Sequence, residues 1–313
     1  MRALVTGAAG FIGSHLVEAL LGDSRVTYLR AADNLSTGKM ENIRPFLSRI
    51  EFVEGDLLDD AVRERAVRGI DIIFHEAAIP SVPRSVQDPI VSHMAGDHLT
   101  LLVLDSARRA GVKRLIYAGS SSAYGDTEVL PKVETMAPNP RSPYAVSKLA
   151  GEYYAAAFAR CYSIDTVSLR YFNVFGPRQD ENSPFSAVIA KFCSAFKRNE
   201  PLVIHADGMQ SRDFCHVDNV VSANLLAAFS AQPLKGQVLN IGCGERHTLM
   251  QMVELLNELS GETRQPQFAP PRPGDVKHSQ ADIARAREVL GYEPRVRFKE
   301  GLAKTFEWYK RNA

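Results

Sequence analysis

The sequence predicts an α/β protein: a doubly wound parallel sheet with a smaller, mostly helical C-terminal module. In the first half of the chain, short apolar runs alternate with segments of helical periodicity, which is typical of right-handed βαβ units. A glycine-rich turn separates the first apolar run from the first helical segment. After about residue 175, prolines divide the chain into shorter elements, which indicates a second module.

The expected elements follow one another along the chain. The first strand, Arg2–Thr6 (RALVT), ends at Gly7, and a helix follows over Phe11–Leu21. The same periodicity predicts strands at Val26–Ala32, Ile50–Val53, Ile70–Phe74 and Arg114–Tyr117, and helices near 59–67, 87–110 and 143–162. We expect two later strands to join the main sheet, Thr166–Arg170 and Gln237–Ile241, and the second module to contain helices at Ser186–Arg198, Leu249–Leu259 and Asp282–Leu290.

Composition argues against several classes of protein. Lys and Arg number 37 and Asp and Glu 36, so the net charge of +1 creates no field that would attract nucleic acid or an anionic membrane. No apolar run approaches the ~18 residues that span a bilayer, and the start lacks the features of a signal peptide. The four cysteines form no C-x-x-C pair, so we expect no metal site and a reducing, cytoplasmic location.

The glycine-rich turn predicts a phosphate-binding site. Gly7, Gly10 and Gly13 follow the first strand and open the first helix, with Phe11 and Ile12 between them. Glycine lets the backbone approach a pyrophosphate, and the helix N-terminus offers N–H groups and a positive dipole. The spacing is G-x-x-G-x-x-G rather than G-x-G-x-x-G, and a purely structural turn is the alternative.

Acidic and small residues at later strand ends extend this prediction to a whole dinucleotide. Asp33 ends the second expected strand, where a carboxylate binds both ribose hydroxyls of NAD and repels the 2′-phosphate of NADP. The ends of the third and fourth strands reach the same crevice with Asp56 and Leu57 and with Ala77 and Ala78. Asp56 could bind the adenine amino group, or it could be a solvated loop aspartate.

A serine, a tyrosine and a lysine indicate proton-transfer chemistry. Ser142 and Pro143 are a typical helix start, which places Tyr144 and Lys148 on one face at i and i+4. A nearby ammonium lowers the pKa of a tyrosine, so Tyr144 could act as a general base. Ser120, at the end of the fifth strand, could hold the reacting hydroxyl against that base. The alternative is a solvated helix face, on which Y-x-x-x-K is common.

These motifs together resemble the extended short-chain dehydrogenase/reductase family, and within it the UDP-N-acetylglucosamine/UDP-glucose 4-epimerases. The resemblance runs nearly end to end, through TGAAGFIGSHL, DNLSTG, HEAA, SVPRSVQDP, SSSAYGD, SPYAVSK, RYFNVFGPRQ, SRDFCHVDN and RPGDVKHSQADI. It implies a Rossmann domain binding NAD over residues 1–175, with a strand returning near 237–241. Residues 176–313 would form an interleaved UDP-sugar-binding domain, and the enzyme would be a homodimer.

The resemblance also implies roles for individual residues. Ser120, Tyr144 and Lys148 match the catalytic set. Beyond the glycine turn, Asp33 and the strand ends, the implied NAD contacts are Asn34, Ser36, Thr37, Gly38 and Tyr171. The implied sugar-nucleotide contacts are Arg84, Ser121, Ser122, Asn173, Ala187, Val188, Arg212, Arg272, Asp275 and Ser279. Arg212 and Arg272 would clamp the diphosphate, because a planar guanidinium suits phosphate oxygens; the alternative is an exposed charge.

Several differences from related enzymes narrow the reaction types that the resemblance allows. Ser121 and Ser122 replace the Asp-Glu pair of 4,6-dehydratases, and the segment DVKHSQAD lacks the arginine typical of decarboxylases. Arg84 leaves a UDP-glucuronate 4-epimerase open, and a non-catalytic NAD sensor on the same fold is a further alternative. His93 stands where the family commonly has asparagine. Ser279 is a small residue where relatives restricted to unsubstituted hexoses carry tyrosine, unless it caps the helix expected near Asp282.

Overall fold

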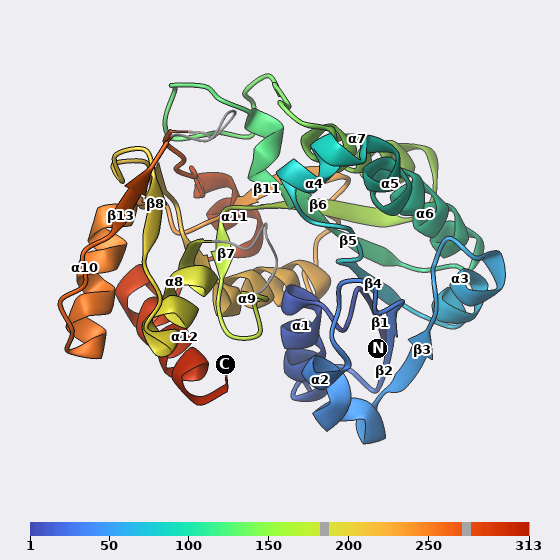
Figure 1. The fold of residues 1–313 in the computed structure, drawn as a ribbon. Coiled ribbons are helices and arrows are strands. Elements are labelled where there is room, and N and C mark those ends of the chain that lie inside the picture. Colours follow the sequence, from blue (N-terminus) through green and yellow to red (C-terminus); the bar gives the residue numbers. More distant parts are fainter. Residues whose placement is uncertain (182–187, 271–276, 313) are drawn as a thin grey trace.

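The computed structural model describes residues 1–181, 188–270 and 277–312, and its larger lobe is built on one parallel sheet (Figure 1). Within these residues the sheet has seven strands in the order β11-β6-β5-β4-β1-β2-β3. The strands are β1 (Arg2–Thr6), β2 (Tyr28–Asp33), β3 (Glu51–Glu54), β4 (Ile72–His75), β5 (Arg114–Ser120), β6 (Asp165–Tyr171) and β11 (Gln237–Ile241). All neighbouring pairs are parallel, which confirms the predicted fold class.

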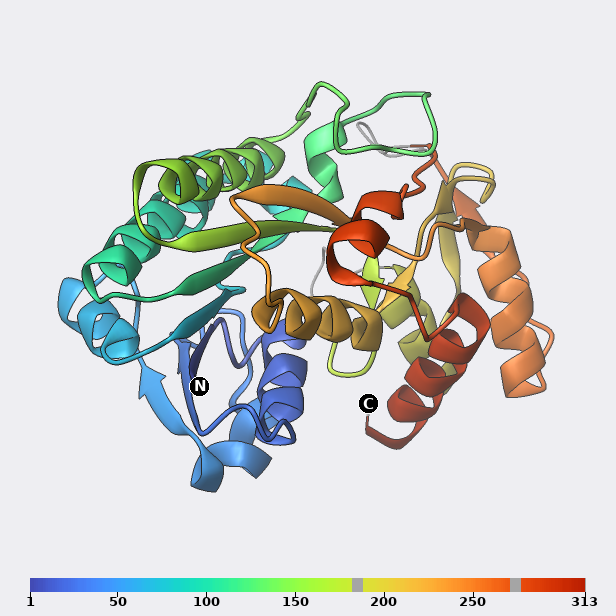
Figure 2. The same ribbon diagram turned by 180° about the vertical axis from the view of Figure 1, so that it is seen from behind.

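Helices cover both faces of the sheet, because alternate strand residues are apolar on both sides. Val5 of β1 belongs to the core that contains Leu16 and Val220, whereas Leu4 belongs to the core that contains Leu104. Figures 1 and 2 show the two helical layers on opposite sides of the sheet. One layer contains α1 (Phe11–Leu21), α9 (Val217–Ala228) and α11 (Ala284–Leu290); the other contains α3 (Asp60–Val67), α6 (Leu99–Arg109) and α7 (Pro143–Cys161).

The smaller lobe is held together by its own apolar core. Phe192 of α8, Leu256 of α10 and Leu302 of α12 are buried in one cluster with Phe175 and Phe214. The helices are α8 (Val188–Arg198), α10 (Leu249–Ser260) and α12 (Phe298–Asn312). Three two-stranded ladders complete this side of the molecule: β7 (Val174–Phe175) with β10 (Cys215–His216), β9 (Ser211–Arg212) with β12 (His247–Thr248), and β8 (Val203–His205) with β13 (Gln267–Ala269).

The single helix expected near 87–110 is wrong, because the chain forms separate helical segments there. The Asp88 side chain accepts a hydrogen bond from the N–H of Val91, and Pro89 lacks an N–H, so a new helix starts at that point. The segments are α4 (Val82–Gln87), α5 (Pro89–His93), a π-helical turn (Met94–His98) and α6. Short helical pieces also occur at α2 (Met40–Ile43) and in 3₁₀ turns at Arg44–Arg49 and Ser121–Tyr124.

The second strand begins later than the sequence predicts. Two helices, α9 and α12, lie in segments for which no helix was predicted. The N–H of Val26 donates to the carbonyl of Asp23 in a turn, so β2 starts only at Tyr28. No helix among the described residues has both the length and the apolar character needed to cross a bilayer.

The strand order places a crevice at the centre of the sheet. β2 and β3 lie on one side of β1, and β4, β5 and β6 follow on the other side. The connections therefore diverge between β1 and β4, and the carboxyl ends of these two strands open onto one space. Ligands of open α/β sheets bind at such a switch point.

Candidate active site

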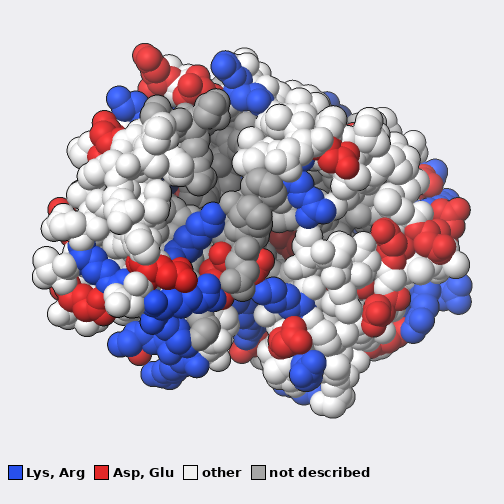
Figure 3. Space-filling model, in the orientation of Figure 1, with Lys and Arg blue, Asp and Glu red and all other residues white. Residues whose placement is uncertain are grey.

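A cleft of about 1340 Å³ lies outside the carboxyl ends of the strands. Figure 3 shows this face hollowed between the two lobes. The larger lobe contributes the glycine turn, the strand ends and the start of α7, and the smaller lobe contributes Arg212 and Ser279. Residues of both predicted binding sets therefore line one space.

The glycine turn has no room for side chains. Gly7 has φ +65°, and a Cβ there would lie 2.8 Å from the backbone of Ala77. A Cβ on Gly13 would lie 2.1 Å from the carbonyl oxygen of Gly7. Gly10 is the N-cap residue of α1, and it has no side chain to bond the N–H groups of the first turn. This bare cradle fits a dinucleotide pyrophosphate, with the backbone N–H groups of Phe11 and Gly13 at the helix start.

Asp33 is fixed beside that cradle. Its Oδ2 accepts from the N–H of Ala9 at 2.9 Å, and its Oδ1 accepts from the N–H of Leu35 at 2.8 Å. Burial raises the pKa of Asp33, while these backbone donors act in the opposite direction. Gly38 packs behind it, because a Cβ there would lie 2.9 Å from the Asp33 carboxylate. A carboxylate held at the end of β2 suits the ribose hydroxyls of a dinucleotide.

The remaining predicted dinucleotide contacts all line the cleft except Gly38. Asp56 is exposed, accepts from the N–H of Leu58 at 2.9 Å and from the Asn34 amide at 3.1 Å, and so caps its own turn. Unlike Gly38, it lines the cleft. The other cleft-lining positions from these predictions are Asn34, Ser36, Thr37, Leu57, Ala77, Ala78 and Tyr171.

The structure brings Ser120, Tyr144 and Lys148 together in the cleft. The Ser142 side chain accepts from the N–H of Ala145 at 3.2 Å and starts α7 as the sequence predicts. Lys148 is buried, and its Nζ donates to the carbonyl of Ala118 at 2.8 Å. A hydrogen bond links the side chains of Tyr144 and Ser120.

The electrostatic effect on Tyr144 differs from the expected one. Burial raises the pKa of Tyr144, and the negative charge of Glu76 raises it further, whereas the hydrogen bond from Ser120 lowers it. Burial also lowers the pKa of Lys148 to about 8. The sequence does not show this, because desolvation of the phenol depends on segments distant in the chain.

Among the predicted sugar-nucleotide contacts, six line the cleft: Arg84, Ser121, Ser122, Asn173, Arg212 and Ser279. Arg212 donates through Nη1 to the carbonyls of Ser211 and Lys277, at 3.1 and 3.0 Å, which anchors its side chain. Val188 begins α8 and is not among the described residues that line the cleft. Ala187, Arg272 and Asp275 lie outside the described residues.

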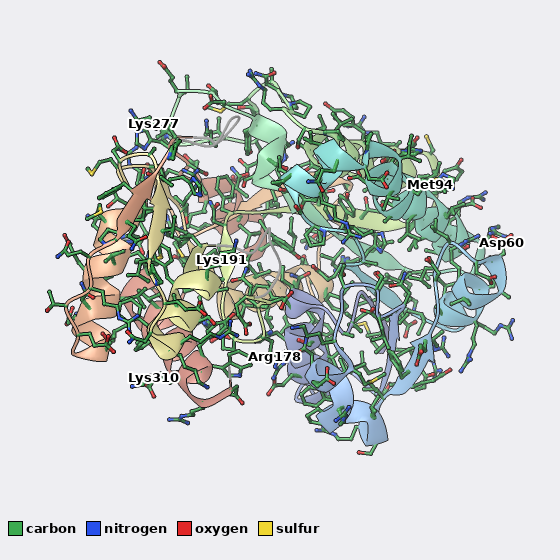
Figure 4. The ribbon with its side chains drawn as sticks, in the orientation of Figure 1. Asp60, Met94, Arg178, Lys191, Lys277 and Lys310 are labelled. Carbon is green, nitrogen blue, oxygen red and sulfur yellow. The ribbon has the colours of Figure 1, made fainter. Side chains whose placement is uncertain are left out.

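Six charged cleft residues were not predicted: Lys39, Glu76, Lys132, Arg141, Arg178 and Asp180. Arg178 pairs with Glu18 of α1, and its Nη1 is buried without a hydrogen-bond partner among the described residues. Figure 4 shows Arg178 between the lobes, beside α1. Lys39 pairs with Asp180 at 2.7 Å. Arg178 lies within the quoted motif RYFNVFGPRQ and Glu76 within the quoted motif HEAA, and these motifs could have identified both residues.

The position where the family commonly has asparagine, His93, ends α5 just before the π-helical turn. His93 is half-exposed, and its Nδ1 lies 2.9 Å from Oδ2 of Asp97. The N–H of Asp97 donates a hydrogen bond to Oγ of Ser147 in α7 at 3.1 Å. His93 does not line the cleft in the described part of the chain, and no group of three His, Cys, Asp or Glu residues there could hold a metal ion.

A dinucleotide cradle and a Ser–Tyr–Lys set in one cleft define an enzyme of the short-chain dehydrogenase/reductase class. The chain belongs to the NAD dependent epimerase/dehydratase family, whose model matches residues 3–242. It is 39% identical over 314 residues to a UDP-glucose 4-epimerase of Mycolicibacterium smegmatis, covering 99% of each chain.

Solved structures are similar over the whole chain, among them those of two epimerases. The first is a UDP-N-acetylglucosamine 4-epimerase from Methanobrevibacter ruminantium in complex with UDP-N-acetylmuramic acid, with 38% identity, a TM-score of 0.94 and coverage of 100% of this chain and 99% of that one. The second is a UDP-glucuronic acid 4-epimerase from Bacillus cereus with UDP-glucuronic acid and NAD, with 32% identity, a TM-score of 0.93 and full coverage of both chains.

Proposed function

We propose that this protein is an NAD-dependent 4-epimerase of UDP-hexoses that accepts both UDP-glucose/UDP-galactose and their N-acetylated forms. The observation that carries the proposal is the single cleft in which the glycine cradle, Tyr144 and Ser120 face Arg212 and Ser279. In this assignment residues 1–175 hold the dinucleotide, and residues 176–313, interleaved with them, hold the UDP-sugar. The epimerases among the relatives support the reaction class.

The residues divide the chemistry between them. Tyr144 takes the proton of the sugar O4 and later returns it, while Ser120 orients that hydroxyl. A dinucleotide held by the glycine turn and Asp33 would supply the nicotinamide that takes up and returns the C4 hydride. Lys148 contributes positive charge to the same pocket, and Arg212 binds the diphosphate so that the oxidised sugar can turn before it is reduced.

Ser279 supports acceptance of the N-acetylated substrate. It is 9% exposed, lines the cleft, and its N–H donates to the carbonyl of Ser211 at 3.0 Å. It does not cap α11, which begins at Ala284 after Ile283. A small side chain at this point leaves room for an acetamido group.

A UDP-glucuronate 4-epimerase is the second candidate. Arg84 lines the cleft from α4, where a guanidinium can meet a sugar carboxylate. The similar Bacillus cereus enzyme bears that name.

A substrate panel tests both candidates. Purified protein is incubated with UDP-glucose, UDP-N-acetylglucosamine and UDP-glucuronate, and the epimers are separated. We expect turnover of the first two with no net consumption of added NAD. Exclusive turnover of UDP-glucuronate would favour the second candidate, and stoichiometric release of NADH would contradict epimerisation.

We also propose that the protein is a homodimer formed through α4, α5 and α7. The exposed apolar side chains Val86, Ile90, Val146 and Tyr153 lie on these helices, with exposed fractions of 65, 68, 53 and 60%. Light scattering after size exclusion tests this: Ile90→Glu should shift the protein toward monomer, and a wild-type monomer would contradict it.

A further inference from the structure

Glu76 is a carboxylate at the floor of the cleft for which the proposed reaction has assigned no role. It follows β4 directly, next to Ala77, whose backbone packs against Gly7. The Tyr171 hydroxyl donates to Oε1 of Glu76 at 2.8 Å, and the Asn224 amide donates to the Tyr171 oxygen at 2.8 Å. Since Tyr171 and Asn224 are buried, this chain of hydrogen bonds fixes the carboxylate in place.

The Glu76 carboxylate interacts electrostatically with Tyr144 and Lys148. A second carboxylate, Glu152, is also close to Lys148, but it forms a buried ion pair with Arg170 at 2.7 Å. Glu76 instead accepts a hydrogen bond from the neutral hydroxyl of Tyr171, and when it is ionised its charge acts on both Lys148 and Tyr144. The carboxylate opposes formation of the Tyr144 phenolate, so assistance to the base does not explain its presence.

A positively charged ligand group in the same pocket would explain why a carboxylate is present at Glu76. The hydride and the proton leave C4 and O4 of one sugar, so the nicotinamide ring and Tyr144 must both contact that C–O unit. The oxidised ring is positively charged and the reduced ring is neutral. The positive charge of Lys148 alone would favour the neutral, reduced ring. A carboxylate in the same pocket would instead favour the positively charged, oxidised ring.

Building on the proposed function, we propose that Glu76 is the electrostatic partner of the oxidised nicotinamide ring and keeps the bound dinucleotide ready to accept hydride. An epimerase must return every hydride to its sugar, because an enzyme left with the reduced dinucleotide cannot start another cycle. Glu76 would stabilise the oxidised over the reduced form of the bound dinucleotide without contacting the sugar.

The relative affinity for NAD⁺ and NADH tests the role without measuring activity. Calorimetric titration of wild type, Glu76→Gln and Glu76→Met with each nucleotide gives the ratio of the two dissociation constants. We expect both variants to lose affinity for NAD⁺ relative to NADH by about tenfold, which raises the reduction potential of the bound dinucleotide by about 30 mV. Glu254→Gln, an exposed position on α10, makes the same charge change away from the cleft and should leave the ratio unaltered.

Two results would overturn the inference while leaving the proposed function intact. One is an unchanged ratio in both Glu76 variants; the other is equal weakening of both nucleotides, which would indicate only a packing role. A wild-type protein that binds neither nucleotide would overturn the proposed function, and this inference with it.

Discussion

Ser120 illustrates how one hydroxyl is oriented by its neighbours. The backbone N–H and the hydroxyl of Ser122 both donate to Oγ of Ser120, at 3.2 and 2.8 Å. With its lone pairs engaged, Ser120 directs its own proton toward another oxygen, and Tyr144 is its partner in the cleft. The hydrogen bond stabilises the phenolate form of Tyr144 against burial.

Removing the Tyr144 hydroxyl should abolish proton transfer and spare binding. We predict that Tyr144→Phe lowers kcat by about 10²–10⁴-fold, because a positioned general base contributes that much. Dissociation constants for UDP and NAD should change little, and steady-state kinetics with calorimetry measure both. Tyr162→Phe is the matched control, since Tyr162 is an exposed tyrosine at the end of the same helix. Near-normal kcat in Tyr144→Phe would refute the assignment.

Enlarging Ser279 should separate the two substrates. We predict that Ser279→Tyr abolishes turnover of UDP-N-acetylglucosamine and retains that of UDP-glucose, because the phenol would occupy the space that the acetamido group needs. The kcat/KM values of the two substrates are compared with those of Ser48→Tyr, an exposed position in a 3₁₀ turn. Equal losses on both substrates would point to misfolding, and unchanged N-acetyl turnover would contradict the placement.

At the scale of elements, the junction of β1 and α1 depends on close backbone contacts. Gly13 lies in the first turn of α1, so closely packed on Gly7 that any side chain must displace the turn. The opposite end of the same helix is tolerant: a Cβ on Gly22 would come no closer than 3.5 Å to its nearest neighbour, and φ there is −89°.

We predict that Gly13→Ala weakens NAD binding at least about tenfold, because the cradle must open to admit the methyl group. The dinucleotide retained through purification and its dissociation constant by calorimetry provide the measurement. Gly22→Ala should bind NAD like the wild type. If Gly13→Ala did so too, the cradle would not be the pyrophosphate site.

At the scale of the whole molecule, Asp213 joins segments from distant parts of the chain. Its carboxylate accepts from the backbone N–H groups of Cys243, Gly244 and Ala281 at 2.8, 3.0 and 3.0 Å. The residue is fully buried, and burial raises its pKa to about 6. It therefore holds the end of β11 and the approach to α11 beside the smaller lobe.

Asp213→Asn should destabilise the fold by roughly 2–3 kcal/mol, because the amide group places N–H donors against backbone donors and leaves them unsatisfied. Urea unfolding of the two proteins, at unchanged m-value, measures the difference. Asp207→Asn serves as the control, since Asp207 is exposed and accepts one backbone N–H, from Met209. A difference below about 0.5 kcal/mol would show that water satisfies these groups.

The pH dependence of stability should reflect Glu76. Burial raises its pKa from 4.5 to about 7, so between those values the folded state binds a proton that the unfolded state does not. Its contribution to the unfolding free energy therefore falls as pH rises through this range. Relative to Glu76→Gln, nucleotide-free wild type should lose on the order of 1–3 kcal/mol between about pH 5 and about pH 8 in urea unfolding. A constant difference would contradict the shift.

Local patterns identify much of the fold and part of the site. The run Arg2–Thr6 is buried on both faces, so it reads as an internal parallel strand, and Ser142 with Pro143 marks the start of α7 through bonds within a single turn. The glycine turn is equally local. Features of this kind depend on neighbours a few residues apart, which a linear pattern preserves.

Other features arise from contacts between distant segments. Glu76 meets Tyr171, and Tyr171 meets Asn224, only because β4, β6 and α9 pack together, and no residue near Glu76 in the sequence signals these contacts. The raised pKa of Tyr144 has the same origin, since desolvation is set by everything that surrounds the phenol. Sequence patterns therefore indicate which groups are available for the chemistry, while three-dimensional packing sets their charge, because burial and long-range contacts are properties of the assembled chain.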